Sequence, residues 1–109
     1  MDMKTPRINA GRMSRYIGER VRVVAKIVKV NAPTAMVELS DGGQIEVKLS
    51  SDSHMGGPYV EIIGQVENEK SLKMFKAINL GDNIDMAVVN HTIELMHTPV
   101  MSQYWSTKP

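Results

Sequence analysis

The chain has 109 residues, a formal net charge of +1 and 42% apolar residues, which predicts one folded domain with a modest core. The near-neutral charge disfavours a protein that coats nucleic acid by charge alone, because such domains usually carry a strong basic excess. The lack of cysteine excludes disulfides and thiolate metal sites, and no apolar run suggests a membrane span or a secretion signal.

The first predicted element is a short helix that Asn9 would cap and Gly18 would end. Met13, Tyr16 and Ile17 share one face of this helix. We therefore expect it to cover an open end of a sheet structure and to carry no chemistry of its own.

From Glu19 onward apolar residues recur at every second position, the period of a β-strand. The alternating apolar residues are Val21, Val23, Ala25 and Ile27. After Ile27 the apolar residues shift from the odd to the even positions, to Val28 and Val30. A shift of this kind predicts a bulge, which lets one strand serve two parts of a curved sheet. This pattern favours a barrel.

Four more strands are predicted, over residues 35–39, 44–49, 60–66 and 71–80. The Ser-Asp-Gly-Gly run at residues 40–43 predicts a hairpin, because glycine tolerates the positive φ of the turns that match strand twist. Gly64 predicts a bulge or a close approach of another backbone. Residues 50–58 form a loop, in which His54 is more consistent with a solvated residue than with a metal ligand.

The last predicted element is a helix over residues 81–97, capped by Asp82 or Asn83 and stopped by Pro99. It has two apolar faces. We expect the inner face to hold Ile84, Ala87, Val88, His91 and Leu95, and the outward face to hold Met86, Val89, Ile93 and Met96. Either both faces are buried within the domain or the outward face joins a helix bundle with other chains.

Five strands with a bulged first strand favour an all-β fold with flanking helices, the five-stranded OB-fold barrel. An SH3-like barrel is the nearest alternative. The long loop at residues 50–58 favours the OB-fold, because OB barrels usually carry a helix or an insertion between the third and fourth strands. We expect residues 1–81 to form the barrel with its N-terminal helix, and residues 82–109 to form an assembly helix and tail.

Particular residues resemble a known family. Pro-Arg-Ile-Asn-Ala-Gly at residues 6–11, Tyr-Ile-Gly at 16–18, Val-Arg-Val-Val-Ala-Lys-Ile at 21–27, Leu-Ser-Asp-Gly at 39–42 and Val-Glu-Ile-Ile-Gly-Gln-Val at 60–66 are similar to the small subunit of replication protein A. The first of these runs is the most specific. The likeness extends over nearly the whole chain, although the loop at residues 50–58 lacks the acidic character of the family and the tail beyond Pro99 matches less well.

The resemblance implies a nuclear heterotrimer that coats single-stranded DNA in replication, repair and recombination. The partners implied are the middle and large subunits, which would meet the terminal helix in a trimerisation bundle. We expect contacts from the outward face of the helix (Met86, Val89, Ile93, Met96) and from the tail (Val100, Met101, Tyr104, Trp105), where the two aromatic residues either touch a partner or cover the end of the bundle.

Direct DNA binding by this chain is expected to be weak. The strands between Glu19 and Leu49 contain no aromatic residue, whereas single-strand binding on a barrel uses aromatic platforms and a basic groove. The candidate residues are Arg22, Lys26, Lys29, Lys48, Lys73, Phe75 and Lys76, with Arg20 and Lys70 as further cations. Solvated strand residues are the simpler interpretation of this set.

No phosphate loop, nucleophile motif or paired histidine ligands occur in the sequence, so we expect no enzymatic activity, no cofactor, no metal and no small-molecule substrate. Two alternatives stay open. One is a stand-alone OB module that binds nucleic acid directly, and the other is the related small subunit of a telomere-capping trimer.

Overall fold

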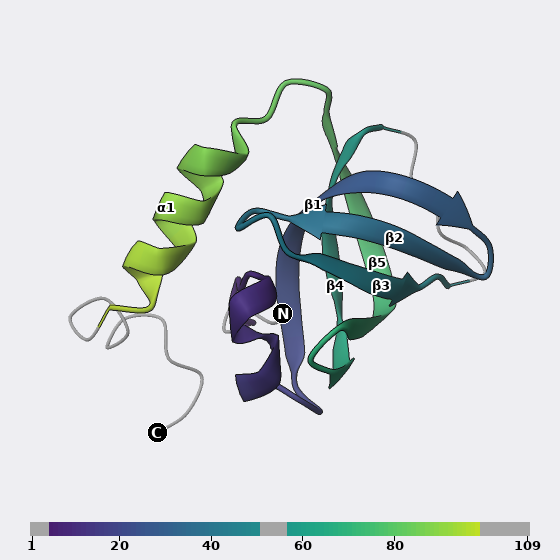
Figure 1. Cartoon of the computed structure of the whole chain (residues 1–109), viewed down its shortest axis with the longest axis horizontal. Helices are drawn as coiled ribbons and strands as arrows, with labels where there is room; N and C mark the ends of the chain where they lie inside the picture. The colour runs from purple at the N-terminus through teal and green to yellow at the C-terminus, as the bar shows by residue number, and fades with distance from the viewer. Residues whose placement is uncertain (1–4, 51–56, 99–109) are drawn as a thin grey trace.

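The computed structural model describes residues 5–50 and 57–98. Five strands close into a barrel in the order β1-β2-β3-β5-β4, in which β3 and β5 are parallel and the other pairs are antiparallel. The strands are β1 (Arg20–Asn31), β2 (Thr34–Leu39), β3 (Gln44–Lys48), β4 (Tyr59–Asn68) and β5 (Ser71–Gly81). A 3-10 helix η1 (Ala10–Arg15) precedes them and a helix α1 (Met86–Met96) follows (Figure 1). This is the expected OB-fold architecture.

The long first strand pairs twice, as its apolar pattern predicts. Its first half pairs with β4 and its second half with β2. The register with β2 shifts between Ile27 and Lys29, which is where the apolar parity changes in the sequence. Val28 and Val30 do not continue the core, however, because the β1–β2 hairpin extends beyond the barrel and leaves both side chains half exposed (Figure 1).

Gly64 confirms the prediction of a bulge with close backbone approach. A Cβ atom at this position would collide with the backbone carbonyl of Lys73. The pairing of β4 with β5 steps from Gly64 opposite Met74 to Ile63 opposite Lys76. Phe75 is therefore the extra residue of the bulge, and it has no partner on β4.

η1 lies at one end of the barrel, where Met13 is fully buried in the core. Ile17 is exposed, contrary to expectation, because the 3-10 helix ends at Arg15 and its tighter winding does not keep the predicted face. Asn9 makes no side-chain cap hydrogen bond. Instead, Asp41 of the β2–β3 hairpin accepts hydrogen bonds from the backbone N–H groups of Ala10 (3.3 Å) and Gly11 (2.9 Å).

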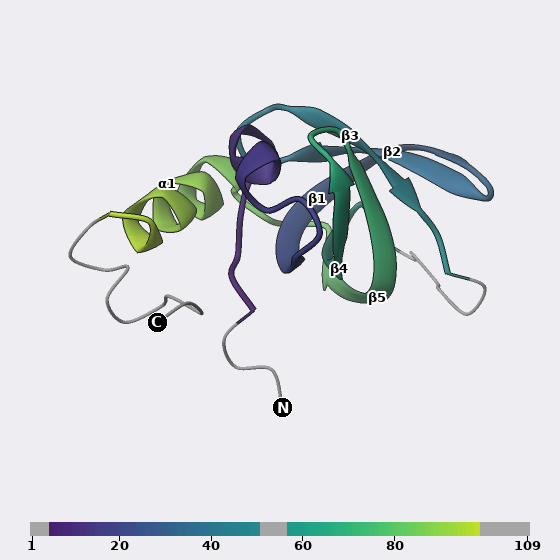
Figure 2. The ribbon, with the colours of Figure 1, turned by 90° about the horizontal axis from the view of Figure 1, so that it is seen from below.

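The terminal helix is shorter than predicted, because β5 continues to Gly81 and α1 begins only at Met86. Its N-cap is Asp85, which accepts hydrogen bonds from the N–H groups of Ala87 (3.0 Å) and Val88 (3.2 Å); Asp82 and Asn83 lie in the linker. Figures 1 and 2 both place α1 beside η1 and away from the far end of the β1–β2 hairpin. Within residues 5–50 and 57–98, no helix is long and apolar enough to span a membrane.

Candidate functional site

The two apolar faces of α1 are oriented opposite to the sequence-based expectation. Ile93 is 0% exposed, and Met86, Val89 and Met96 are partly buried. Val88 and Leu95, which were expected to pack inward, are 59% and 49% exposed, and Ala87 and His91 are exposed with them. The assignment of Met86, Val89, Ile93 and Met96 to an outward face is therefore wrong.

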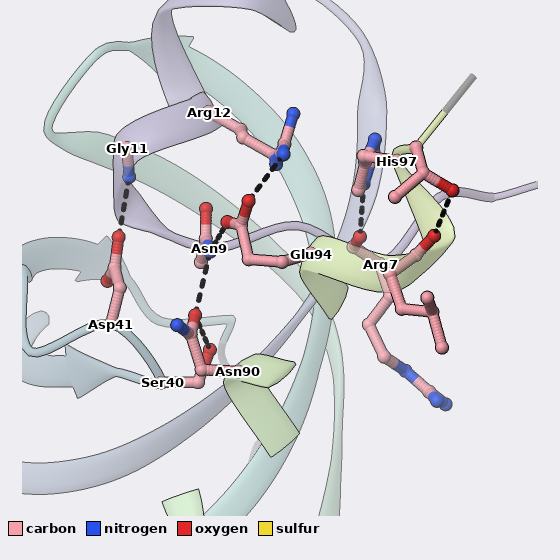
Figure 3. A network of polar contacts seen from close by, with 11 residues as sticks. Arg7, Asn9, Gly11, Arg12, Ser40, Asp41, Asn90, Glu94 and His97 are labelled. Atoms are coloured by element: carbon pink, nitrogen blue, oxygen red, sulfur yellow. Dashed lines mark hydrogen bonds and ion pairs between the residues drawn. The ribbon is translucent and has the colours of Figure 1, made fainter. Parts of the chain in front are cut away.

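A network of polar side chains explains this orientation (Figure 3). The Nδ2 group of Asn9 donates to Asn90 Oδ1 (2.8 Å) and to Glu94 Oε2 (2.7 Å). Arg12 donates to the other oxygen of Glu94 (2.7 Å), and Ser40 Oγ donates to Asn90 Oδ1 (3.2 Å). We call these five residues the Asn9 network. It joins η1, the β2–β3 hairpin and α1, and it turns the Ile93 side of the helix toward the barrel.

The C-terminal end of α1 is tied to the N-terminal segment as well. The ring Nε2 of His97 donates a hydrogen bond to the carbonyl oxygen of Arg7 (2.9 Å), and the ring meets Tyr16 edge to face with centroids 6.2 Å apart. Arg7 in turn pairs with Glu61 of β4 (2.7 Å). The middle and the C-terminal end of α1 are therefore tied to the rest of the chain.

Glu94 stays charged within the Asn9 network. The hydrogen bonds from Asn9 and then Arg12 lower the pKa of the Glu94 carboxyl below its ordinary value, against the opposing effect of desolvation. A charged acceptor makes stronger hydrogen bonds than a neutral one. The network is therefore strongest where Glu94 is ionised.

The structure divides the predicted DNA-binding residues into separate groups. Lys26 and Lys29 are exposed on the half of β1 that pairs with β2. Lys48 of β3 forms an ion pair with Glu67 (2.9 Å), which raises the pKa of Lys48 mainly through the hydrogen bond between them. The remaining four lie on the outer side of β1 and β5, on either side of β4: Arg22, Lys73, Phe75 and Lys76.

The outer face of β2 and β3, where OB-folds often bind their ligands, is hollowed but poorly suited to stacking. The hollow is lined by Met36, Gln44, Ile45, Glu46, Lys48, Asn68, Lys70 and Ser71. None of these side chains is aromatic, and Glu46 adds a negative charge. Stacking of bases is therefore not supported on this face.

Two contacts were missed from the sequence. The guanidinium group of Arg20 lies over the ring of Phe75, 5.1 Å from its centroid, and Asn9 holds α1 where a helix cap was expected. The bulge at Gly64 was a usable signal for the first contact, because a bulge re-aims a side chain. No local pattern signals the second.

The predicted tail residues Val100, Met101, Tyr104 and Trp105 lie outside the described residues, as does His54 in the loop between β3 and β4. Their proposed roles stay predictions.

Nearly the whole chain is similar to known proteins. The family model described as Replication factor A protein 3 matches residues 1–103. A replication protein A 14 kDa subunit from Arabidopsis thaliana is 29% identical over 97 residues, which cover 87% of this chain and 91% of that protein. The solved structure of U. maydis replication protein A bound to ssDNA contains a similar chain with a TM-score of 0.88 and 26% identity, covering 97% of this chain and 99% of that one.

A second solved structure bears on the telomere alternative. The telomere capping protein Ten1 from Schizosaccharomyces pombe matches with a TM-score of 0.66 but only 8% identity, over 84% of this chain and 95% of that one. This second likeness shows the shared fold alone. The family model, in contrast, extends over nearly the whole sequence and describes non-enzymatic subunits. This chain therefore belongs to the Replication factor A protein 3 family.

Proposed function

We propose that this chain is the small assembly subunit of a nuclear, heterotrimeric complex that binds single-stranded DNA. In this proposal α1 joins helices of the middle and large subunits in a bundle, and the barrel makes only weak contact with DNA. Support comes from the family match and from the similar chain in the structure of U. maydis replication protein A bound to ssDNA. The single observation that carries the assembly role is the exposed apolar face of α1.

That face consists of Ala87, Val88 and Leu95, with the exposed His91 between the two large apolar residues; Ile84, expected on the same face, lies before the N-cap Asp85 and outside α1. Spacings of three and four residues place these side chains along one side of the helix. An apolar stripe of this kind is costly in water and is typical of a helix that packs into a partner's groove. Val88 and Leu95 are the natural anchors, because they are the largest exposed apolar side chains of α1.

The other side of α1 supports the same role. Ile93 is buried, and the Asn9 network ties the helix to η1 and the β2–β3 hairpin, so the exposed face is presented in one direction before a partner arrives. A surface that is ordered in advance loses less conformational entropy on binding. The proposed boundary between the barrel and the assembly region lies after Gly81, where β5 ends.

The test is a pull-down with the intact chain and with a chain that ends after Gly81, from a nuclear extract of the source cells, with partners identified by mass spectrometry. We expect two larger OB-containing subunits to come down with the intact chain and to be lost with the shortened one. Circular dichroism checks that the shortened chain still forms the barrel. Partners that stay with a folded, shortened chain would overturn the assembly role of α1.

A further inference from the structure

We infer that the weak DNA contact of this chain lies on the outer face of β1, β4 and β5, with Arg20 and Phe75 as its stacking platform, and not on the outer face of β2 and β3. This inference rests on the proposed function, because it locates the contact that the proposal assigns to the barrel. The occupant is single-stranded nucleic acid.

The platform is built by the bulge at Gly64. Phe75 has no partner on β4, and its side chain is 42% exposed on the outside of the barrel. Arg20 reaches it from β1, with the guanidinium group 5.1 Å from the ring centroid. An aromatic ring and a guanidinium plane are the two groups on which unpaired bases stack.

Cations flank this platform on both sides. The register places Arg20, Gln65 and Lys73 in one row across β1, β4 and β5, and it places Arg22, Ile63 and Lys76 in the next row. Each row thus has a cation on β1, a neutral residue on β4 and a cation on β5. Because neighbouring strands are about 4.8 Å apart, the Cα atoms of the two cations in a row lie roughly 10 Å apart, with a lane of neutral β4 residues between them.

The two carboxylates of β4 are both paired. Glu61 of β4 is buried and forms an ion pair with Arg7 (2.7 Å). Glu67, near the end of β4, forms an ion pair with Lys48 (2.9 Å). Lys48 lowers the pKa of the Glu67 carboxyl, and the charge of Lys73 contributes to the same shift. On a chain with a formal net charge of only +1, this face therefore concentrates positive charge, as a polyanion requires.

The outer face of β2 and β3 has neither the aromatic platform nor the concentration of positive charge. Its outward positions include Glu38 and Glu46, and its one cation among the strand residues, Lys48, is paired with Glu67. No aromatic side chain lines its hollow. Among the described residues, the combination of an exposed ring and two rows of flanking cations thus favours the β1–β4–β5 face.

The experiment measures binding of the purified full chain to a fluorescently labelled oligothymidylate by anisotropy, over a series of salt concentrations. Phe75→Ala is expected to weaken binding about fivefold, the low end of what one stacked base contributes, and to leave the salt dependence unchanged. Lys76→Gln is expected to reduce the slope of log K against log salt by about 0.7, because one phosphate contact is lost. Thermal unfolding checks that both variants fold.

Two matched controls accompany these variants. Lys29→Gln removes an exposed lysine from the β1–β2 hairpin, and Val28→Ala truncates an exposed apolar side chain of the same hairpin; neither should change affinity or slope. Unchanged binding by Phe75→Ala, an equal effect of Lys29→Gln, or equally tight binding of a duplex would overturn the inference. If the unaltered chain binds no oligothymidylate at low salt, the DNA contact is wrong while the assembly role, tested separately by co-purification, still stands.

Discussion

Replacing Asn9 by alanine should release α1 from the barrel without unfolding the barrel. Asn9 is buried, and its Nδ2 group makes two hydrogen bonds to α1, to Asn90 (2.8 Å) and to Glu94 (2.7 Å). After the substitution Asn90 keeps its bond from Ser40, and Glu94 keeps its bond from Arg12. The loss is therefore confined to the contact between the N-terminal segment and the helix.

The magnitude follows from these contacts. A neutral hydrogen bond contributes about 1 kcal/mol. The bond to Glu94 contributes about the same, because half of that side chain is exposed and water screens the charge. The gross loss of about 2 kcal/mol is partly offset, since Asn9 Oδ1 is buried without a hydrogen-bond partner among the described residues and disappears with the side chain. The net destabilisation of the docked helix is about 1.4 kcal/mol, a tenfold change in its opening equilibrium.

Hydrogen exchange followed by mass spectrometry measures this directly. Amides of α1 should lose about tenfold in protection, whereas amides of β4 and β5 should keep theirs, because the helix opens as a separate unit. Asn83→Ala is the matched control, since Asn83 is exposed in the linker before α1. Unchanged protection of α1, or an equal loss in the barrel strands, would refute the reasoning.

Two further predictions concern the barrel and the pH dependence of the chain. Gly64→Ala should lower the free energy of unfolding by about 1–3 kcal/mol, because the new Cβ meets the Lys73 carbonyl. Gly57→Ala is the control, because a Cβ at that position has room. Urea denaturation measures both variants, and a loss for Gly64→Ala no larger than that for Gly57→Ala would contradict the prediction. The pKa of Glu94 is lower in the folded chain than its ordinary value of 4.5, so its stabilising effect is complete above that pH and is lost as the pH falls through the folded value. The melting temperatures of the unaltered chain and Glu94→Gln should therefore converge on acidification, and a gap independent of pH would count against the network.

Local patterns in the sequence predict most of the barrel. The parity change after Ile27 locates the bulge that lets β1 pair twice, and Gly64 marks the close approach of β4 and β5. The Ser40–Gly43 run places the β2–β3 hairpin, where Gly42 has a φ of 87°. Each of these features depends on residues that are neighbours in sequence or on the period of one strand, and such signals can be read without knowledge of the fold.

The orientation of α1 could not be predicted in the same way. Its two apolar faces are nearly equivalent by period, so hydrophobicity does not decide which one turns inward. The decision comes from Asn9, which lies 81 residues before Asn90 and 85 before Glu94. Polar residues on the edge of a helix reveal their role only when their partners are placed beside them, and Asn9 itself also suits a helix cap.

The candidate DNA-binding residues show a similar limit. Lysines at alternate strand positions look alike in the sequence. In the closed barrel, Lys26 and Lys29 lie on the half of β1 that pairs with β2, and Lys48 forms an ion pair with Glu67. Lys73 and Lys76 lie on either side of Phe75 in β5. The strand order β1-β2-β3-β5-β4 decides this distribution.

The most direct test of the central claim is co-purification of single-residue variants with the two larger subunits. Leu95→Asp and Val88→Asp place a charge on the exposed apolar face of α1, and Val30→Asp places the same charge on an equally exposed residue of the β1–β2 hairpin. If the helix face is the assembly surface, the first two variants should lose the partners, because a hot-spot substitution costs at least about 2 kcal/mol, a roughly 30-fold loss of affinity. Val30→Asp should keep them. Retention of both subunits by Leu95→Asp and Val88→Asp, with loss in Val30→Asp, would place the assembly surface on the barrel and contradict the account.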